Sequence, residues 1–473
     1  MVDGRALTAQ FEDAADFETR KVLCGGQLLM VLFLDGLTSG RDIAEQVLRP
    51  LAQMTDEARE EVLYTRALQG GVWCASVKEP ESTQQAAELL VNGFCVILFP
   101  KSGKALGCEV KTGEKRSPSP PETENTVKGA KDAFTETLRT NTSLVRRHLR
   151  TPGLRLAETV IGKRTLTKVT VCWIDRLTDP ELPRRMQERL SSIDIDGALS
   201  PAAIEEYVTG SRRTAFPLLE YTERTDHFCQ GLLDGQVGLL ADGLPLGYLA
   251  PVGLGRLMRS PEDRATDFFS ASMLRLLRYA ALGVSLLLPA LYAAMAMFHQ
   301  QMLPTKLLLS IIESKQNVPF STLLEVLGLL CAFELLQQAG LHLPQAVGTA
   351  VSIIGGLVVG TAAVDAKLVS PAALIVTASS GICGFTLPNR ELSDAVRLWR
   401  FVLTVLAGLW GLFGVTVGLL LLLTELAGLE SLGRSYLSPF GRAEVKGALV
   451  RPRLVRQKWR DGALKPMDDQ NQR

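Results

Sequence analysis

The sequence predicts an α+β or α/β soluble N-terminal half of two related subdomains, followed by an all-α polytopic membrane bundle of 4–5 transmembrane helices. Two observations lead to this prediction. Apolar runs long enough to cross a bilayer are concentrated between positions 275 and 430. Before them, a pattern of strand, turn and helix occurs twice in the same order.

The run from Tyr279 to Phe298 marks the boundary between the two halves. It holds 20 residues without one charge. At 1.5 Å per residue it covers roughly 30 Å, the hydrocarbon thickness of a bilayer. Arg275 and Arg278 stand directly before it, as expected at the cytoplasmic end of a membrane helix. We expect this run to be the first transmembrane helix, with Pro289 as a point where it can bend.

Composition and cysteine usage favour a cytoplasmic N-terminal half. The first twenty residues lack the apolar core of a signal peptide, so no secretion is expected. The eight cysteines form no CxxC pair, which argues against a zinc or thioredoxin-like site. Most lie in apolar settings, and buried free thiols in a reducing compartment are the expectation.

The repeated pattern begins with a buried strand that closes on a turn. LDGLT at 34–38 precedes a helix over 41–54, and IDRLT at 174–178 precedes an amphipathic helix up to Leu190. Asp35 and Asp175 are expected to hold these turns through the backbone rather than to act in catalysis. Two unrelated α/β units remain the alternative to a duplication.

A second feature is repeated in the same order. LLVNGFCVILF, which ends at Phe99, reads as a helix end, an Asn-Gly turn and a strand, and 228–243 repeats it with Asp-Gly. Five domains are predicted. They are a first cytoplasmic α/β subdomain (1–111), a linker with a basic helical arm (112–160), a second cytoplasmic α/β subdomain (161–265), a transmembrane helical domain (266–430) and a basic C-terminal tail (431–473).

The basic arm, 131–150, has apolar residues at helical spacing among four arginines. Such a helix can grip phosphates or an anionic membrane surface. A solvated face, or an arm paired with acidic neighbours, is the favoured interpretation. No aromatic interleaving or nucleic-acid motif is present, so no nucleic-acid partner is expected.

Enzyme signatures are missing from the sequence. It has no Walker loop, no GxGxxG, no GxSxG and no HExxH motif. Its four histidines share no ligand spacing. The sequence therefore predicts a protein that is not an enzyme, with no catalytic residue, no cofactor and no metal site.

The membrane half holds three further predicted spans and one doubtful helix. The spans are 346–364, 368–389 and 401–424, and the doubtful helix is 321–344. In the doubtful helix Glu325 and Glu334 bracket eight uncharged residues and fall on roughly opposite faces. Two lipid-facing carboxylates would be costly, so this helix is interfacial, re-entrant or buried in an assembly. The two carboxylates are expected to attract cations or to pair with a partner helix.

Topology depends on the doubtful helix. If it spans the membrane, there are five spans, and the basic tail lies on the opposite side from the N-terminal half. If it does not, there are four spans and both termini are cytoplasmic. The basic residues of the tail, from Lys446 to Lys465, favour four spans.

A stripe of small polar residues follows one face of the predicted helix 346–364. Packing against another helix is one interpretation, and a pore wall with flanking apolar residues as a gate is the other. Candidate pore-lining residues are Gln345, Thr349, Ser352 and Gly356, with Val351 and Ile353 as the candidate gate. Small-xxx-small pairs predict close helix packing at Gly356, Gly360, Gly414 and Gly418.

Several separate blocks resemble the GerA-family spore germination proteins, the A subunits of nutrient germinant receptors. In the membrane half these are FHQQMLPT (298–305), VSIIGGLVVG (351–360), LVSPAALIV (368–376) and YLSPF (436–440). In the soluble half they are FTETLRTNTSLVRRHLR (134–150), SIDIDG (192–197) and YTERTD (221–226). The resemblance covers nearly the whole chain in order. Arg176 is a departure, since a glycine like Gly36 is expected there.

The resemblance implies a multi-pass subunit in the inner membrane of dormant spores. It implies as partners a permease-like B subunit and a lipoprotein C subunit, besides the lipid bilayer. It also implies a homo-oligomer that conducts ions when nutrient triggers the receptor. A non-conducting scaffold is the alternative, as is a subunit of the related branch linked to dipicolinate release.

Overall fold

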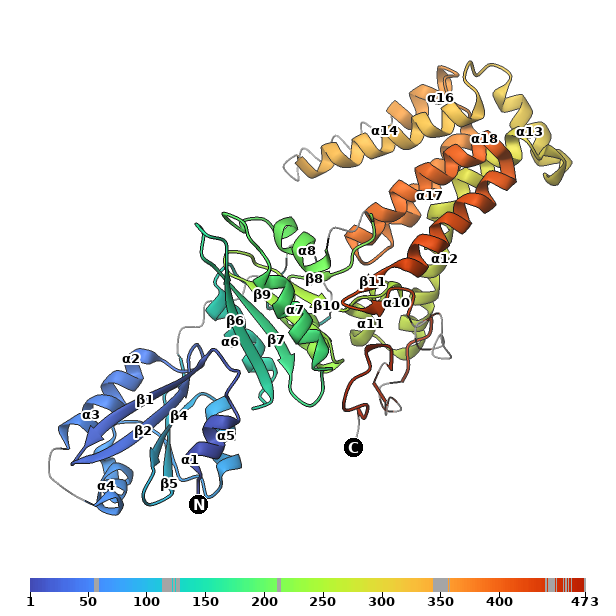
Figure 1. The fold of residues 1–473 in the computed structure, drawn as a ribbon. Coiled ribbons are helices and arrows are strands. Elements are labelled where there is room, and N and C mark those ends of the chain that lie inside the picture. The colour runs from blue at the N-terminus through green and yellow to red at the C-terminus, as the bar shows by residue number, and fades with distance from the viewer. Residues whose placement is uncertain are drawn as a thin grey trace.

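The protein is a row of two α/β subdomains and a helical region, shown in Figure 1 from the blue N-terminal end to the orange and red helices. This computed structural model describes residues 1–54, 59–112, 121, 124, 128–210, 214–342, 356, 358–438, 440, 447, 449–453, 455, 457, 459–460 and 462–471. Most of the predicted linker, 112–129, lies outside the described residues.

The first subdomain is a five-stranded antiparallel sheet with the order β1-β2-β4-β5-β3. Its strands are β1 Phe17–Cys24, β2 Gln27–Leu34, β3 Val77–Lys78, β4 Phe94–Phe99 and β5 Lys104–Glu109. Its helices are α1 Gly4–Ala9, α2 Gly40–Asp42, η1 Ile43–Leu48, α3 Arg49–Gln53, α4 Glu60–Arg66, η2 Ala67–Gly71 and α5 Thr83–Val91. All side chains of β4 are buried because helices cover both faces of the sheet.

The second subdomain repeats this topology. Its sheet has the order β6-β7-β9-β10-β8, which is the order of the first sheet shifted by five strands. Its strands are β6 Leu154–Ile161, β7 Thr167–Ile174, β8 Glu220–Thr222, β9 Val237–Ala241 and β10 Gly247–Ala250. Its helices are α6 Leu138–His148, α7 Glu181–Ser191, α8 Pro201–Thr209, α9 Thr225–Leu233, α10 Leu254–Leu257 and α11 Glu262–Ala265. The shared order agrees with the predicted relation between the two units.

The turns at the ends of β2 and β7 adopt the same backbone region despite different residues. Gly36 has φ +88° and Arg176 has φ +60°. The predicted Asn92-Gly93 turn and its Asp-Gly counterpart also use a left-handed glycine, with φ +81° at Gly93 and +99° at Gly235. The turn geometry is therefore kept where the sequence departs at Arg176.

Exchanging glycine and side chain at this turn should change stability in opposite directions. Arg176→Gly removes the left-handed strain of a residue with a Cβ and is expected to raise the free energy of unfolding by about 0.5–1 kcal/mol. Gly36→Ala adds that strain, and its Cβ would lie 3.4 Å from the Arg139 carbonyl oxygen, so a loss of about 1–2 kcal/mol is expected. Urea unfolding of the full chain in detergent measures both, and equal effects of one sign would contradict the shared turn geometry.

Helix α6, the core of the predicted basic arm, joins the two subdomains. Arg146 holds Asp16 of the first subdomain through two hydrogen bonds of 2.7 Å, and both side chains are almost completely buried. Arg139 lies 3.3 Å from Asp35, and the Ser143 hydroxyl donates to the Gly36 carbonyl. These contacts support the favoured interpretation, an arm paired with acidic neighbours.

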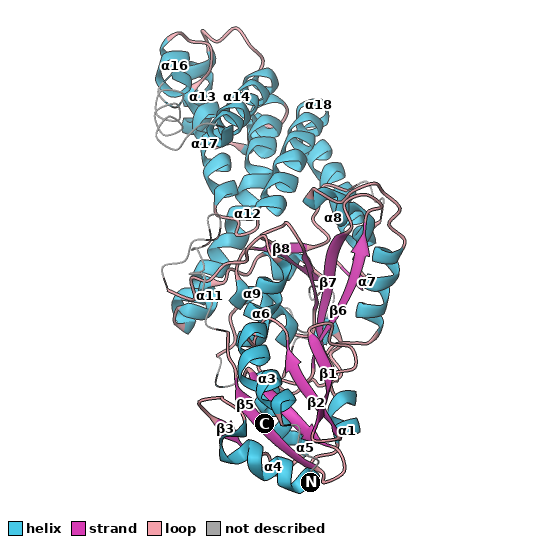
Figure 2. Ribbon diagram, turned by 90° about the vertical axis from the view of Figure 1, so that its left-hand side faces the viewer, coloured by secondary structure: helices cyan, strands magenta, loops and turns pink. Residues whose placement is uncertain are grey.

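The helical region lies away from the two sheets (Figure 2). Its elements are α12 Phe268–Met297, η3 Gln300–Met302, α13 Thr305–Lys315, α14 Thr322–His342, η4 Val358–Ala362, α16 Ala363–Asp365, α17 Pro371–Phe385 and α18 Arg390–Gly428. The chain then forms β11 Glu430–Ser431, β12 Arg434–Ser435 and η6 Gly462–Leu464. Among the described residues, three helices, α12, α14 and α18, are long and apolar enough to cross a membrane.

Helix α18 is a hairpin, and its reversal lies inside the predicted span 401–424. Gly411 has φ +63° and ψ −141°, a conformation that only glycine adopts readily. The chain reverses there, because Leu403 and Ala407 pack against Val415. We call residues 390–410 the first arm and residues 412–428 the second arm.

The other predicted spans also differ in detail. Within the predicted span 368–389, helix α17 has 15 residues and is about 22 Å long. This helix is shorter than the hydrocarbon core of a bilayer. The doubtful helix, α14, is long and apolar enough to cross. Of the predicted helix 346–364, the described part is Gly356 and 358–364, so the count of 4–5 spans is not confirmed.

The C-terminal tail lies on the same side as the α/β half. The Met467 amide donates to the Leu177 carbonyl at 2.8 Å, and Arg460 donates to the Leu233 carbonyl at 3.0 Å. Both acceptors belong to the second subdomain. These contacts place the tail against the second subdomain, and the same-side topology that its charges favour stays a prediction.

Candidate functional site at the junction with the membrane helices

The second subdomain, the beginning of α12 and both ends of α18 meet at one junction. Leu257 and Met258, which follow β10, share a core with Leu392 of the first arm and Leu426 of the second arm. The loop between α17 and α18 also reaches this core through Leu387. The second subdomain therefore packs against several helices of the helical region at once.

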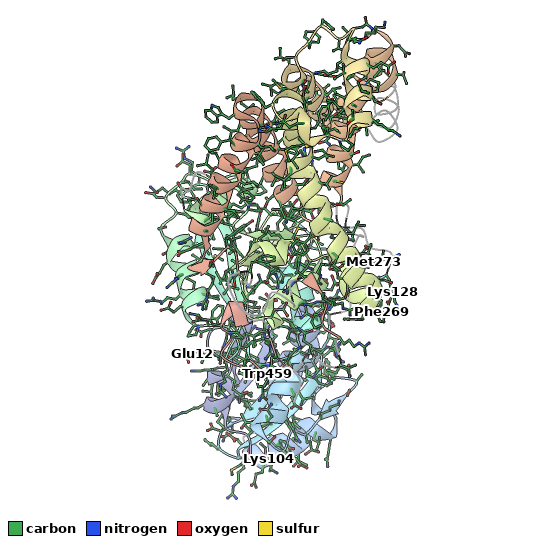
Figure 3. All side chains as sticks on the ribbon, turned by 90° about the vertical axis from the view of Figure 1, so that its right-hand side faces the viewer. Glu12, Lys104, Lys128, Phe269, Met273 and Trp459 are labelled. Atoms are coloured by element: carbon green, nitrogen blue, oxygen red, sulfur yellow. The ribbon has the colours of Figure 1, made fainter. Side chains whose placement is uncertain are left out.

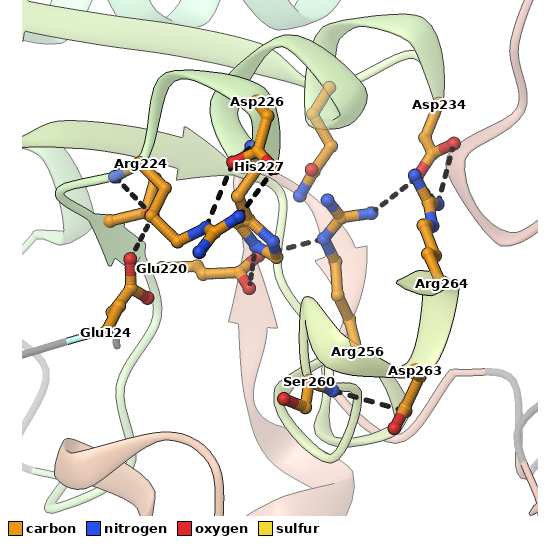
Figure 4. Close-up of polar contacts among 12 residues, drawn as sticks. Glu124, Glu220, Arg224, Asp226, His227, Asp234, Arg256, Ser260, Asp263 and Arg264 are labelled. Atoms are coloured by element: carbon orange, nitrogen blue, oxygen red, sulfur yellow. Dashed lines mark hydrogen bonds and ion pairs between the residues drawn. The ribbon is translucent and has the colours of Figure 1, made fainter. Parts of the chain in front are cut away.

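A buried ionic network stabilises the subdomain side of the junction (Figure 4). Glu220, on β8, accepts from Arg256 Nε at 2.8 Å and pairs with His227 Nε2 at 2.9 Å. Arg256 also donates to Asp234 Oδ2 at 3.0 Å, and Arg264 lies 3.1 Å from the same oxygen. The network thus connects β8 and α9 with α10 and α11, the two helices directly before α12.

Opposite charges decide the protonation of this network. Burial alone would raise the pKa of the Glu220 carboxyl, but the charges of Arg256 and His227 and their hydrogen bonds outweigh burial and hold it at about 2. Burial is likewise outweighed at Asp234, whose pKa is lowered by Arg256 and Arg264. By contrast, burial dominates at Glu124, whose pKa is raised beside the network.

The network should make the junction sensitive to acid. A pKa of about 2 at Glu220 lies below the unfolded value of about 4.3, so its contribution is complete above the unfolded pKa and is lost as pH falls through the folded pKa. We expect roughly 3 kcal/mol of stability to disappear between about pH 5 and pH 2. Circular dichroism of the full chain in a nonionic detergent measures this, and Glu220→Gln should flatten that part of the pH profile. An unchanged profile would contradict the assignment.

The first turns of α12 are fixed to the junction by one buried carboxylate. Asp263, on α11, lies 3.2 Å from Arg275 Nη2 and 2.8 Å from Arg278 Nη1. The two arginines that stand before the first apolar run therefore share one buried carboxylate inside the protein. Figure 3 shows Phe269 and Met273 pointing outward from the same end of α12, and both are 73% exposed.

The end of α18 is fixed to the same subdomain. The Ser431 hydroxyl donates to the Leu218 carbonyl and accepts from the Val252 amide. It therefore joins β11 to the segment just before β8 and to the segment just after β10. Arg434 pairs with Asp179 at the beginning of α7. Tyr436 is fully buried against Phe216 in the junction core.

A cavity of about 920 Å³ opens between α8 and the first turns of α18. Its lining includes carboxylates from both sides of the junction, and they are Glu205, Glu206, Glu391 and Asp394. In the described part of the chain, no group of three or more His, Cys, Asp or Glu side chains is placed to hold a metal ion. The cavity therefore lies within the junction, with acidic side chains from α8 and from α18 in its lining.

Most of the candidate pore residues lie outside the described residues. This applies to Gln345, Thr349 and Ser352, and to the candidate gate residues Val351 and Ile353. Gly356 is described and exposed. The stripe and its gate therefore stay predictions.

The candidate packing glycines divide into two groups. Among the residues that the structure describes, a Cβ on Gly356 or Gly360 would meet no atom within 4 Å, so neither makes a close approach to them. A Cβ on Gly414 would lie 1.9 Å from the Leu406 carbonyl oxygen, and one on Gly418 would lie 2.4 Å from the Leu403 side chain. The second group therefore closes the hairpin of α18 on itself rather than joining separate spans.

The two glutamates of α14 both contact other segments of the helical region. Glu325 accepts from the Ser370 amide, just before α17, and lies 3.5 Å from Lys315 Nζ. Glu334 accepts from Arg397 Nη1 of the first arm at 3.0 Å. Within the protomer both carboxylates pair with helices, and cation attraction stays a prediction.

Sequence reasoning missed the ionic residues of the junction and the arginines of the first arm. The block YTERTD includes residues next to Glu220 and His227, but a sequence does not show which distant arginine they meet. Arg397 and Arg400 stand three residues apart at the edge of an apolar run, and this spacing is the sequence signal that could have singled them out.

Comparisons with known proteins agree with the membrane architecture. A family model described as "Bacillus/Clostridium GerA spore germination protein" matches residues 5–466. The chain is 36% identical over 450 residues to the membrane protein YfkQ of Bacillus subtilis, covering 94% of this chain and 87% of YfkQ.

Further relatives are described as spore germination proteins. Spore germination protein KA of Bacillus subtilis is 34% identical, covering 93% of this chain and 81% of its own length. Spore germination protein GerLA of Bacillus cereus is 32% identical, with 91% and 88% coverage.

One solved structure matches part of the chain. It is the N-terminal domain of the A subunit of the Bacillus megaterium spore germinant receptor GerK3, with 24% identity and a TM-score of 0.42. It covers 52% of this chain and 92% of that domain. On the family match and the full-length relatives, the chain belongs to the GerA family of spore germination proteins.

Proposed function

We propose that this chain is the membrane subunit of a spore germinant receptor that transmits a nutrient signal from its α/β half to its membrane helices. In this proposal it oligomerises in the spore inner membrane, with its N-terminal half in the cytoplasm, and conducts ions when triggered. Its partners are a permease-like B subunit and a lipoprotein C subunit. The dipicolinate-release branch of the family is the alternative assignment of the same architecture.

The observation that supports transmission is the double attachment of the second subdomain. It holds the beginning of α12 through Asp263 and the end of α18 through Ser431 and Arg434. A ligand can shift a population only through a difference in affinity for two states. Binding at a partner that moves this subdomain would therefore act on two membrane helices at once.

The exposed apolar surface of the helices supports an assembly. Leu335 on α14, Phe413 on α18 and Ile382 on α17 are each at least 66% exposed. Lipid covers such side chains, and neighbouring copies can do so as well. The stripe 345–356 is proposed to line the ion path of that assembly.

The test is ion flux with site-directed labelling. The full chain, alone and with its B and C partners, is reconstituted into vesicles and nutrient is added. Flux is expected together with labelling of cysteines placed at Gln345, Thr349, Ser352 and Gly356 by a membrane-impermeant thiol reagent. Protection of all four positions before and after nutrient would exclude the pore assignment, and absence of flux and oligomers would favour a scaffold.

A further inference from the structure

The contact between α14 and the first arm of α18 is ionic and incomplete. Glu334 uses Oε1 to accept from Arg397, whereas its Oε2 is buried and has no hydrogen-bond partner among the residues that the structure describes. Arg397 also lies 2.8 Å from Asp394, one turn earlier on the same arm. Arg397 is thus shared between two carboxylates, while half of the Glu334 carboxylate is unused.

One turn further along the first arm stands a second arginine without a carboxylate. Arg400 is 2% exposed, and its Nη1 donates to the Ser380 hydroxyl at 3.2 Å. Its Nε has no hydrogen-bond partner, and within the described part of the chain no carboxylate is at ion-pair distance. Arg400 nevertheless lies on the same face of the first arm as Arg397, which Glu334 contacts, because residues three apart on a helix are neighbours.

The direction of α14 makes a second pairing available. Leu323 lies beside Gly408, and Glu334 lies beside Arg397, so α14 runs antiparallel to the first arm. Arg397 and Arg400 are three residues apart on one helix, and Glu334 and Gln337 are three apart on the other. Gln337 Oε1 is also buried without a partner.

We propose that α14 has a second register, shifted by three residues toward Gly411, in which Glu334 pairs with Arg400 and Gln337 accepts from Arg397. The shift is about 4.5 Å, three residues of helical rise. It gives partners to all three groups that lack them here. Interfaces of this kind are bistable, because an ion pair at membrane depth is either made or lost.

The present register is held at the other end of α14. Glu325 is 2% exposed, accepts from the Ser370 amide and lies near Lys315. A shift of three residues breaks these contacts while it forms those of Arg400. Each register therefore satisfies one end of α14 at the expense of the other, which is what a two-state element requires.

The shift is the element that the proposed nutrient signal would bias, and in that role it rests on the proposed function. Its own test needs no flux. Spin labels are placed at Leu335→Cys on α14 and Leu409→Cys on α18, both exposed positions, after Cys74, Cys331 and Cys383 are replaced by serine. Double electron–electron resonance measures the distance between the labels in nanodiscs.

Arg397→Gln should shorten the main label distance by about 4–5 Å, because Glu334 then pairs with Arg400. Adding Arg400→Gln to that variant should restore the present distance. Glu325→Gln, which leaves both arginines intact, should shorten it in the same direction. Labels at Leu398→Cys and Leu409→Cys, both on the first arm, should show no change in any variant.

An unchanged distance in both Arg397→Gln and Glu325→Gln would overturn the second register. Equal shortening with and without Arg400 would also overturn it, because the shift would not depend on the proposed pair. A register shift without nutrient-gated flux in the reconstituted receptor would reject the proposed channel function but support the second register. Nutrient-gated flux without a register shift would support the channel function and reject the second register.

Discussion

Arg146→Ala is expected to lower the free energy of unfolding by about 3–5 kcal/mol, because it leaves the Asp16 carboxylate buried without its cation. The Asp16 and Arg146 side chains are 2% and 1% exposed, so water cannot replace the lost hydrogen bonds. Urea unfolding of the full chain, followed by circular dichroism, gives the change. Limited proteolysis should also cut the variant faster between the two subdomains.

Two variants separate the buried ion pair from a general effect of altering α6. Arg147→Ala removes the neighbouring exposed arginine and should change stability by less than about 0.5 kcal/mol. The double variant Asp16→Leu with Arg146→Met replaces the pair by apolar side chains and should recover most of the loss. A loss below about 1 kcal/mol in Arg146→Ala would show that the pair does not fix the subdomains together.

The sequence predicted the elements of the α/β half better than the contacts between them. The buried strand before Asp35, the Asn92-Gly93 turn and their later counterparts follow from apolar runs and from glycine at left-handed turns. These signals are local, so a few neighbouring residues carry them. The pairing of Asp16 with Arg146 joins residues 130 positions apart, and a basic helix alone does not reveal its acidic partner.

The membrane half shows the same limit more sharply. Hydropathy records apolar length, and 401–424 is apolar throughout, but the reversal at Gly411 depends on one left-handed glycine in an apolar run. Gly414 and Gly418 fit a packing motif equally well between separate helices and inside a hairpin. Glu334 could be recognised as costly in lipid, whereas its partner Arg397 could be identified only in the folded chain.

Arg256→Ala should be as destabilising as the loss of Arg146, at about 3–5 kcal/mol, because one guanidinium serves two buried carboxylates. Its removal leaves Glu220 with His227 and leaves Asp234 with Arg264. Arg256→Lys keeps the charge but loses the fork that reaches both carboxylates, so an intermediate loss is expected. Arg184→Ala on α7 removes an exposed pair with Glu188 and serves as the control, with a change below about 1 kcal/mol.

The pH profile distinguishes loss of this charge from simple loss of packing. Without Arg256 the pKa of the Glu220 carboxyl is less depressed, so less stability should be lost between about pH 5 and pH 2, and this part of the pH profile should be flatter than in the unmodified chain. A packing defect would lower stability equally at all pH values. Arg256→Ala should also loosen the beginning of α12, because α10 loses its connections to β8 and Asp234 and only Arg264 of α11 still holds Asp234. We expect faster proteolysis between Leu254 and Asp267, with α18 unaffected. This result would identify the network as the attachment of α12 to the second subdomain. Uniform destabilisation at every pH would reject that role.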